Sequence, residues 1–407
     1  MTTGAAGQHT LQVQEPFATS LRRGLPLVWA TGSGDDLTAT LGWGEAFRAT
    51  ARGLDRFGTL DDAFTRWAAR QGPDANPVAF ATLTFAHDSS AESVLVVPQL
   101  IGRWAGGVLT VASQVAEPVG ARLPRPSVPG EFEELELLPG TLTRQRYRQA
   151  VAAAVGRIAD GEVEKVVIAR DLLATSPDPL DVPALLARLQ EANTASWTFH
   201  VDGLVGSSPE MLVATTGDRV HSQVLAGSAP VTGDVGLDDV TATRLAASAK
   251  DHAEHAYAAR SVAERLETVA TVSTRDPQVK RLRRIMHLAT DITGTLHDHH
   301  SALALAGIVH PSAAVCGTPT DVAFRVIAEL EGFDRGRYAG PVGWVDARGD
   351  GEFVIALRCG QVTADGTAIR LFAGGGIVAG SVPSDELAET ARKFLPMYEA
   401  LSPVDRP

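Results

Sequence analysis

The chain has 407 residues, of which 44% are hydrophobic and 21% charged, a composition typical of a globular protein with a large buried core. Its formal net charge of -12 provides no basic stripe to neutralise phosphates, which argues against nucleic acid or an anionic membrane surface as a partner. The start of the chain lacks the cationic and apolar regions of a signal peptide, and no apolar run is long enough to span a membrane, so we expect a cytoplasmic protein.

We expect one large domain preceded by a short disordered tail. Residues 1–15 are polar and form the tail, and residues 16–407 form the domain. Within the domain, 16–116 is an N-terminal part with little patterning, 117–140 is a connector rich in proline and glycine, and 141–407 carries nearly all the motifs.

The first motif after the connector is a helix followed by a strand. "TRQRYRQAVAAAVGRIADG" has helical spacing of its apolar residues and ends at Gly161, and "VEKVVIARD" then reads as a strand. Strand alternation places Lys165 on the same face as Val163 and Val167. An enclosed lysine is desolvated, which favours the neutral amine of a general base, whereas a lysine on an edge strand would reach water.

Glu210 lies in "GSSPEMLV", between two β-like runs. An acid at this place could simply belong to a turn. Burial beside apolar groups would instead raise its pKa and keep it protonated, as a general acid requires.

Two pairs of acids occur at helical spacing. Asp251 and Glu254 belong to a long helix, "ATRLAASAKDHAEHAYAARSVAERLETV", and Glu386 and Glu389 to a helix that begins near Pro383. Each pair projects from one helix face, where it could be solvated or could provide oxygen ligands for Mg²⁺. Only convergence of the two pairs would create a metal site.

Two polar residues fall inside apolar strands. His287, in "IMHLATDITG", could be a hydrogen-bonded core histidine or a metal ligand. Arg358, in "FVIALRCG", is a candidate to bind a carboxylate through two parallel hydrogen bonds from its guanidinium group, and Arg337 and Tyr338 could assist. Residues 338–380 as a whole contain three β-like runs separated by "GDGE" and "ADGT", a pattern of antiparallel hairpins.

The triple glycine at 374–376 is not a phosphate-binding P-loop. In such a loop the last glycine is followed by a lysine and then by serine or threonine, whereas here it is followed by Ile377 and Val378. The glycines could let the backbone approach an anionic ligand, or could mark a tight strand end. The cysteines, Cys316 and Cys359, have apolar neighbours and are interpreted as buried small hydrophobic residues rather than a disulfide.

These segments, in this order, resemble the chorismate-utilising enzymes and, among them, the isochorismate synthases. The resemblance spans residues 163–390 and includes "VEKVVIAR", "GSSPEMLV", "AKDHAEHAYA", "HPSAAVCGTP", "RYAGPVGW" and "AGGGIVAGSVPSDELAET". It implies an α/β (α+β) fold: a single large domain with two stacked antiparallel β-sheets and helices on the outside.

The resemblance also implies a role for each candidate residue. Lys165 would be the base that activates water, and Glu210 the acid that protonates the leaving hydroxyl of chorismate. Glu254 and Glu389 would bind Mg²⁺ directly, while Asp251 and Glu386 would act through metal-bound waters. The residues expected to contact the substrate are His287, Ala314, Val315, Tyr338, Arg358, Gly374, Gly375 and Gly376.

Within the resembling family the nucleophile decides the product. Members that use ammonia lack a lysine at the position of Lys165, so this lysine favours water, and we expect a monomer that needs no amidotransferase subunit. Salicylate synthases keep the lysine and then eliminate pyruvate. The apolar run Ala313, Ala314 and Val315 is more similar to the isochorismate synthases, which leaves salicylate synthase as the alternative. Asp251 departs from the glutamate of some relatives.

Overall fold

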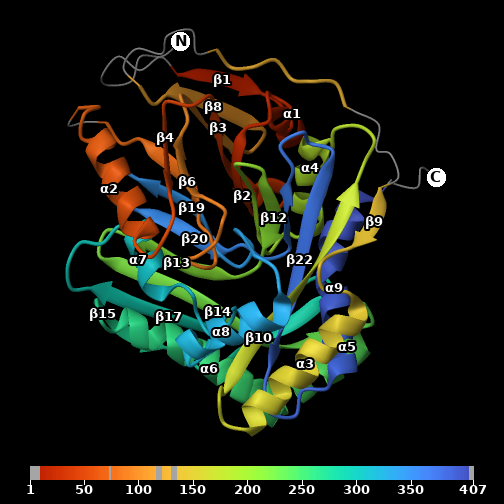
Figure 1. Cartoon of the computed structure of the whole chain (residues 1–407). Coiled ribbons are helices and arrows are strands. Elements are labelled where there is room, and N and C mark those ends of the chain that lie inside the picture. Colours follow the sequence, from red (N-terminus) through yellow and green to blue (C-terminus); the bar gives the residue numbers. More distant parts are fainter. Residues whose placement is uncertain (1–9, 73–74, 116–121, 130–134, 403–407) are drawn as a thin grey trace.

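The computed structural model describes residues 10–72, 75–115, 122–129 and 135–402. Two large antiparallel sheets pack against each other, and helices cover their outer faces (Figure 1). The expected α/β fold with two stacked sheets is therefore confirmed. No helix among the described residues combines the length and the apolar character that crossing a membrane requires.

The first sheet joins strands from the beginning, middle and end of the chain. Along its main path the order is β1-β8-β7-β3-β2-β11-β12-β21-β22-β10-β18, and β9 pairs with β10. Its strands are β1 (Leu11–Gln14), β2 (Leu27–Thr31), β3 (Thr38–Trp43), β7 (Leu100–Ala105), β8 (Val108–Ser113), β9 (Glu136–Pro139), β10 (Lys165–Thr175), β11 (Trp197–Val201), β12 (Leu204–Ser208), β18 (Gly317–Thr318), β21 (Cys359–Val362) and β22 (Ala368–Ile377).

The second sheet has the order β15-β17-β14-β13-β20-β19-β5-β6-β4, with β16 paired to β17. Its strands are β4 (Phe47–Ala51), β5 (Val78–Thr82), β6 (Ser93–Val97), β13 (Met211–Thr216), β14 (Arg219–Pro230), β15 (Ala270–Thr274), β16 (Gln278–Arg281), β17 (Ile285–Leu296), β19 (Pro341–Asp346) and β20 (Gly351–Ile355). The N-terminal part thus contributes strands to both sheets.

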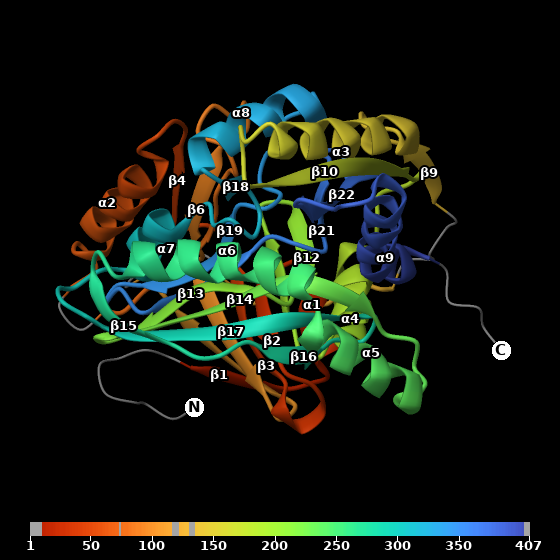
Figure 2. The same cartoon turned by 90° about the horizontal axis from the view of Figure 1, so that it is seen from below.

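The helices divide between the two sheets. In Figure 2 α3 lies over β10, and α6 runs beside β14 and β17. The helices are α1 (Phe17–Leu21), α2 (Arg56–Ala68), α3 (Arg144–Ala159), α4 (Val182–Ala192), α5 (Val235–Ala247), α6 (Ala249–Leu266), α7 (Ala302–Val309), α8 (Thr320–Glu331) and α9 (Pro383–Leu401), and a short 3₁₀ turn spans Gly34–Asp36.

The expected long helix before residue 268 is in fact two helices. Ser248 ends α5 and also caps α6, because its hydroxyl accepts a hydrogen bond from the backbone N–H of Asp251. A serine has little effect on helical periodicity, so the apolar pattern continues across the break. The cap fixes the first turn of α6, which carries Asp251 and, one turn later, Glu254.

Three other expectations differ in detail. Residues 338–380 contain four strands, β19 to β22, instead of three. Within the expected tail, residues 1–9 lie outside the described residues, whereas β1 pairs with β8. Within the connector, 117–121 and 130–134 lie outside the described residues, and β9 pairs with β10. Cys316 and Cys359 are buried and free, as expected.

Candidate active site

A glycine-only stretch of strand lies near the β18 end of the first sheet. Gly374, Gly375 and Gly376 belong to β22 and pair with Ala169, Ile168 and Val167 of β10. The glycines therefore lie inside a strand rather than in a turn. Because glycine has no side chain, the face of β22 is open beside β10, where Lys165 is fully buried.

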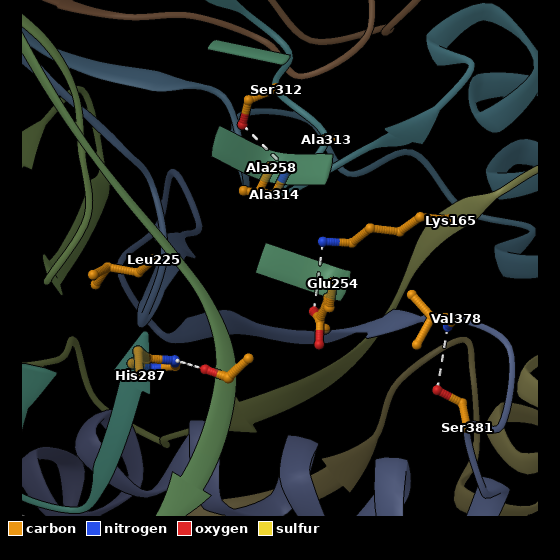
Figure 3. Close-up of polar contacts among 12 residues, drawn as sticks. Lys165, Leu225, Glu254, Ala258, His287, Ser312, Ala313, Ala314, Val378 and Ser381 are labelled. Carbon is orange, nitrogen blue, oxygen red and sulfur yellow. Dashed lines mark hydrogen bonds and ion pairs between the residues drawn. The ribbon is translucent and has the colours of Figure 1, made fainter. Parts of the chain in front are cut away.

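Lys165 reaches across this open face to a carboxylate from α6. Its Nζ lies 3.5 Å from Glu254 Oε1, and it has no hydrogen-bond partner (Figure 3). A Cβ placed on Gly376 would lie 2.1 Å from Glu254 Oε1 and 3.0 Å from Lys165 Cε. The absence of a side chain at 376 is thus required for the Lys165 and Glu254 side chains to meet.

Helix α9 brings two more carboxylates to the same place. A Cβ on Gly375 would lie 3.1 Å from Glu386 Oε2 and 3.8 Å from Glu389 Oε1. Glu389 Oε1 lies 2.6 Å from Lys393 Nζ, and Glu386 Oε1 lies 3.3 Å from Lys250 Nζ. Helices α6 and α9 therefore bring Glu254, Glu386 and Glu389 to the glycine strand, which is the convergence that the spacing of the two acid pairs had left open.

The carboxylates of this cluster influence one another. Burial raises the pKa of Glu254, and the Glu389 carboxylate raises it further against the effect of Lys165. Burial and the nearby Glu389 also raise the pKa of Glu386. Burial opposes ionisation of Glu389 as well, but Lys393 and Ser228 hold its pKa at about 2. The carboxylates of Glu254, Glu386 and Glu389 therefore repel one another, and a bound cation would reduce this repulsion.

Asp251 lies at the edge of this cluster. Its backbone and Cβ pack against Gly227 of β14, and its charge acts on Lys250. Among the described residues, no three acidic, histidine or cysteine side chains are arranged ready to close around an ion. In this structure the lysines serve as the counter-ions of the glutamates.

Glu210 lies in the short link between β12 and β13. Two backbone hydrogen bonds fix its position: its N–H donates to Ser208 Oγ, and its carbonyl oxygen accepts from the Ile355 N–H. The side chain is 4% exposed and accepts one backbone hydrogen bond, from Leu225 at 3.3 Å. Burial raises its pKa to about 7, against the lowering effects of that bond and of Lys165, Lys393 and Arg358. A carboxyl group with this pKa is matched to proton donation near neutral pH.

His287 is buried in β17, and its Nδ1 lies 3.1 Å from the carbonyl oxygen of Gly227 (Figure 3). Because a carbonyl only accepts, Nδ1 donates this bond and Nε2 is left as an acceptor. Burial lowers the pKa of His287 to about 3, so the ring is neutral at physiological pH.

Arg358 does not lie in a strand, contrary to the sequence expectation. It follows β20 and precedes β21, with a φ of 47° in the left-handed region. Apolar alternation on both sides concealed this kink. The turn directs a buried guanidinium toward the site, and burial lowers its pKa. Tyr338 stacks on Phe372, with ring centroids 4.9 Å apart, and its hydroxyl lies 3.2 Å from where a Gly374 Cβ would be.

One cavity collects these groups. Ten of the predicted residues line it, namely Glu210, Glu254, His287, Ala314, Val315, Tyr338, Arg358, Gly374, Gly376 and Glu389. Its free volume is about 60 Å³, room for only a few waters. A larger ligand can therefore enter only if side chains that line the cavity move. The remaining predicted residues lie next to lining residues: Lys165 beside Glu254, Asp251 beside Gly227, and Gly375 and Glu386 beside each other and close to Glu389.

The sequence interpretation missed three polar residues of the cavity: Ser228, Arg335 and Lys393. Lys393 was detectable, since it lies four residues after Glu389 on the same helix, and its Nζ also donates to the Gly374 carbonyl at 2.9 Å. Arg335 forms a buried pair with Glu331 and donates to the carbonyls of Val167 and Val315. Its sequence context, "FDRGRY", gives no sign of that burial.

Comparisons with known proteins point to one family. A family model described as chorismate binding enzyme matches residues 127–402. The chain is 37% identical over 347 residues to the isochorismate synthase DhbC of Bacillus subtilis (strain 168), an alignment that covers 82% of this chain and 83% of that protein.

Solved structures support the same grouping. The crystal structure of DhbC from Bacillus anthracis matches with a TM-score of 0.78 and 32% identity, covering 92% of this chain and 96% of that one. Anthranilate synthase component I from Streptococcus pneumoniae matches with a TM-score of 0.66 over 98% of this chain and 93% of that one, at 18% identity, and so shares the fold.

Proposed function

Because the chain belongs to the chorismate-binding enzymes, we propose that it is an isochorismate synthase, which adds water at C2 of chorismate with loss of the C4 hydroxyl. The relative DhbC, named as an isochorismate synthase and 37% identical, supports this choice. The observation that carries the proposal is the placement of a fully buried lysine and a buried carboxyl group with a pKa of about 7 around one cavity.

Lys165 and Glu210 are suited to opposite proton transfers. Lys165 would take a proton from the attacking water; it is fully buried on β10, and its Nζ lies 3.5 Å from Glu254 Oε1. Glu210 would donate a proton to the C4 hydroxyl, a poor leaving group unless it is protonated. One proton is taken and one is given, so the isomerisation is balanced.

The anchors of the substrate are cationic or apolar. Arg358 provides the fork for the enolpyruvyl carboxylate, with the Tyr338 hydroxyl and the glycine backbone beside it. Ala314 and Val315 supply an apolar wall. Neutral His287 offers only an acceptor at Nε2, so it would position a hydroxyl group rather than bind an anion.

Mg²⁺ is the cofactor that fits the carboxylate cluster. Glu254 and Glu389 would bind it, with Asp251 and Glu386 acting through waters, and the absence of side chains at Gly375 and Gly376 lets the carboxylates of Glu254 and Glu386 approach the strand. Mg²⁺ usually takes one or two carboxylates and completes its shell with water and substrate oxygens, so a closed protein cage is not needed. When bound, the ion would neutralise the substrate's ring carboxylate and hold it in place.

The test is incubation of the purified protein with chorismate and Mg²⁺, followed by chromatographic separation of the products. Isochorismate alone is expected. Salicylate with pyruvate would instead identify a salicylate synthase, and chorismate binding without turnover would identify a non-catalytic sensor.

A further inference from the structure

A second hollow lies directly against the cavity. It has a volume of about 690 Å³ and is bordered by the end of α4, the turn between β16 and β17, and the end of α9. Two residues, Pro209 and Arg358, line both the hollow and the cavity. They form the wall between the two spaces, and Pro209 is the neighbour of Glu210. We call this hollow the arginine groove.

The arginine groove is basic in an acidic protein. Five arginines and two acids line it, an excess of three positive charges, whereas the whole chain has a formal net charge of -12. Four of the charged residues come from the turn "RLRR" and from Glu399, which faces it; the others are Arg188, Glu191 and Arg358. The proposed catalytic machinery gives this basic turn no role.

The arginines of the turn remain accessible although each has an acidic neighbour. Arg281 lies 2.6 Å from Asp239, while Arg283 and Arg284 share the single carboxylate of Glu399. Their side chains are 45%, 53% and 43% exposed. One carboxylate cannot neutralise two guanidinium groups, so Arg283 and Arg284 together keep a net positive charge.

We propose that the arginine groove is the entrance through which the dianionic substrate reaches the cavity, and that Arg283 and Arg284 attract it. This inference rests on the proposed function. A dianion approaching a protein of strongly negative charge is repelled except where a local positive field faces it. The groove is within the usual size of small-molecule sites, whereas the free volume of the cavity is only about 60 Å³.

The entrance ends at the residue that we assign to the substrate carboxylate. Arg358 is buried, borders both spaces and is held in a left-handed turn. A carboxylate in the groove can therefore contact the same guanidinium that later holds it in the cavity. The arginine charges act over roughly a Debye length, so they favour both the encounter and the bound dianion.

The test compares kcat and kcat/KM for chorismate across a range of ionic strength. The Arg283→Gln/Arg284→Gln double variant is expected to lose several-fold in kcat/KM at low salt, with kcat unchanged and with the difference vanishing near 0.5 M salt. The matched control is Arg66→Gln/Arg219→Gln, which removes the same charge from two exposed arginines that also have acidic neighbours and lie outside both spaces.

Glu399→Gln provides a test of opposite sign. It removes the acid shared by the two arginines and should raise kcat/KM at low salt, so it remains informative even if the double variant folds poorly. A double variant that folds, as thermal unfolding would show, and that matches the control pair at every ionic strength would overturn the inference. Absence of turnover by the wild-type protein would overturn the proposed function, and this inference with it.

Discussion

Glu210→Gln should stabilise the protein while abolishing its activity. The carboxyl group ionises at about 4.5 when exposed and at about 7 in the folded protein, chiefly because burial disfavours the charged form. The folded state therefore binds the proton more tightly than the unfolded state between these two pH values. Stability from this group is fully present below about 4.5 and is lost as the pH rises through about 7. The difference is of the order of 3 kcal/mol.

Glutamine resembles the protonated acid and has the same oxygen to accept the hydrogen bond from Leu225. The variant should therefore unfold at higher urea concentration than the wild type at pH 8, by an amount that shrinks toward zero as the pH falls to 4.5. Glu164→Gln, at an exposed position just before β10, is the control and should leave the pH dependence unchanged. An advantage of Glu210→Gln that stays constant across this pH range would refute the assignment of a desolvated carboxyl group.

Three further variants test separate parts of the site. Lys165→Ala should abolish product formation while chorismate still binds, as measured by calorimetry, because it removes proton transfer and leaves the anchors; normal turnover would reject the base. Glu254→Ala should raise the Mg²⁺ concentration needed for half-maximal activity by at least tenfold, and an unchanged titration would exclude it as a ligand. Gly376→Ala places a Cβ 2.1 Å from Glu254 Oε1, so it should weaken Mg²⁺ binding. It should lower the unfolding temperature only slightly, because the Glu254 side chain can move aside. An equal loss of Mg²⁺ affinity in the control variant Gly156→Ala, on α3, would contradict this.

The strands and helices that carry the site could be predicted from periodicity because their apolar patterns are strong. Strand alternation placed Lys165 on the face of Val163 and Val167 but left open whether it is enclosed or reaches water, and the structure shows it fully buried. The helix starting near Pro383 begins at that residue and presents Glu386 and Glu389 to the glycine strand. In these cases local spacing alone determines which way a side chain points.

Periodicity failed where a single residue changes the backbone direction. Ser248 divides the predicted long helix, and Arg358 turns the chain out of an apparent strand. Each change occurs at one polar residue, and the apolar residues on either side keep their spacing, so periodicity does not reveal it. Pairing across the fold was also beyond local reasoning: Lys393 and Lys250 are each near a glutamate of the site, but only the tertiary structure brings Lys250 of α6 to Glu386 of α9.

The ion pairs explain how an acidic cluster can exist before any ligand arrives. Glu254, Glu386 and Glu389 would repel one another if they were alone, and each has a lysine within 3.5 Å. A metal ion and a substrate dianion can enter together at little electrostatic cost, because the ion can pair with the carboxylates while the dianion can pair with Lys393, which lines the cavity and is then released from Glu389. Either one alone would leave like charges facing each other. Binding of Mg²⁺ and chorismate should therefore be mutually dependent, and calorimetric titration of each in the absence and presence of the other would measure that coupling.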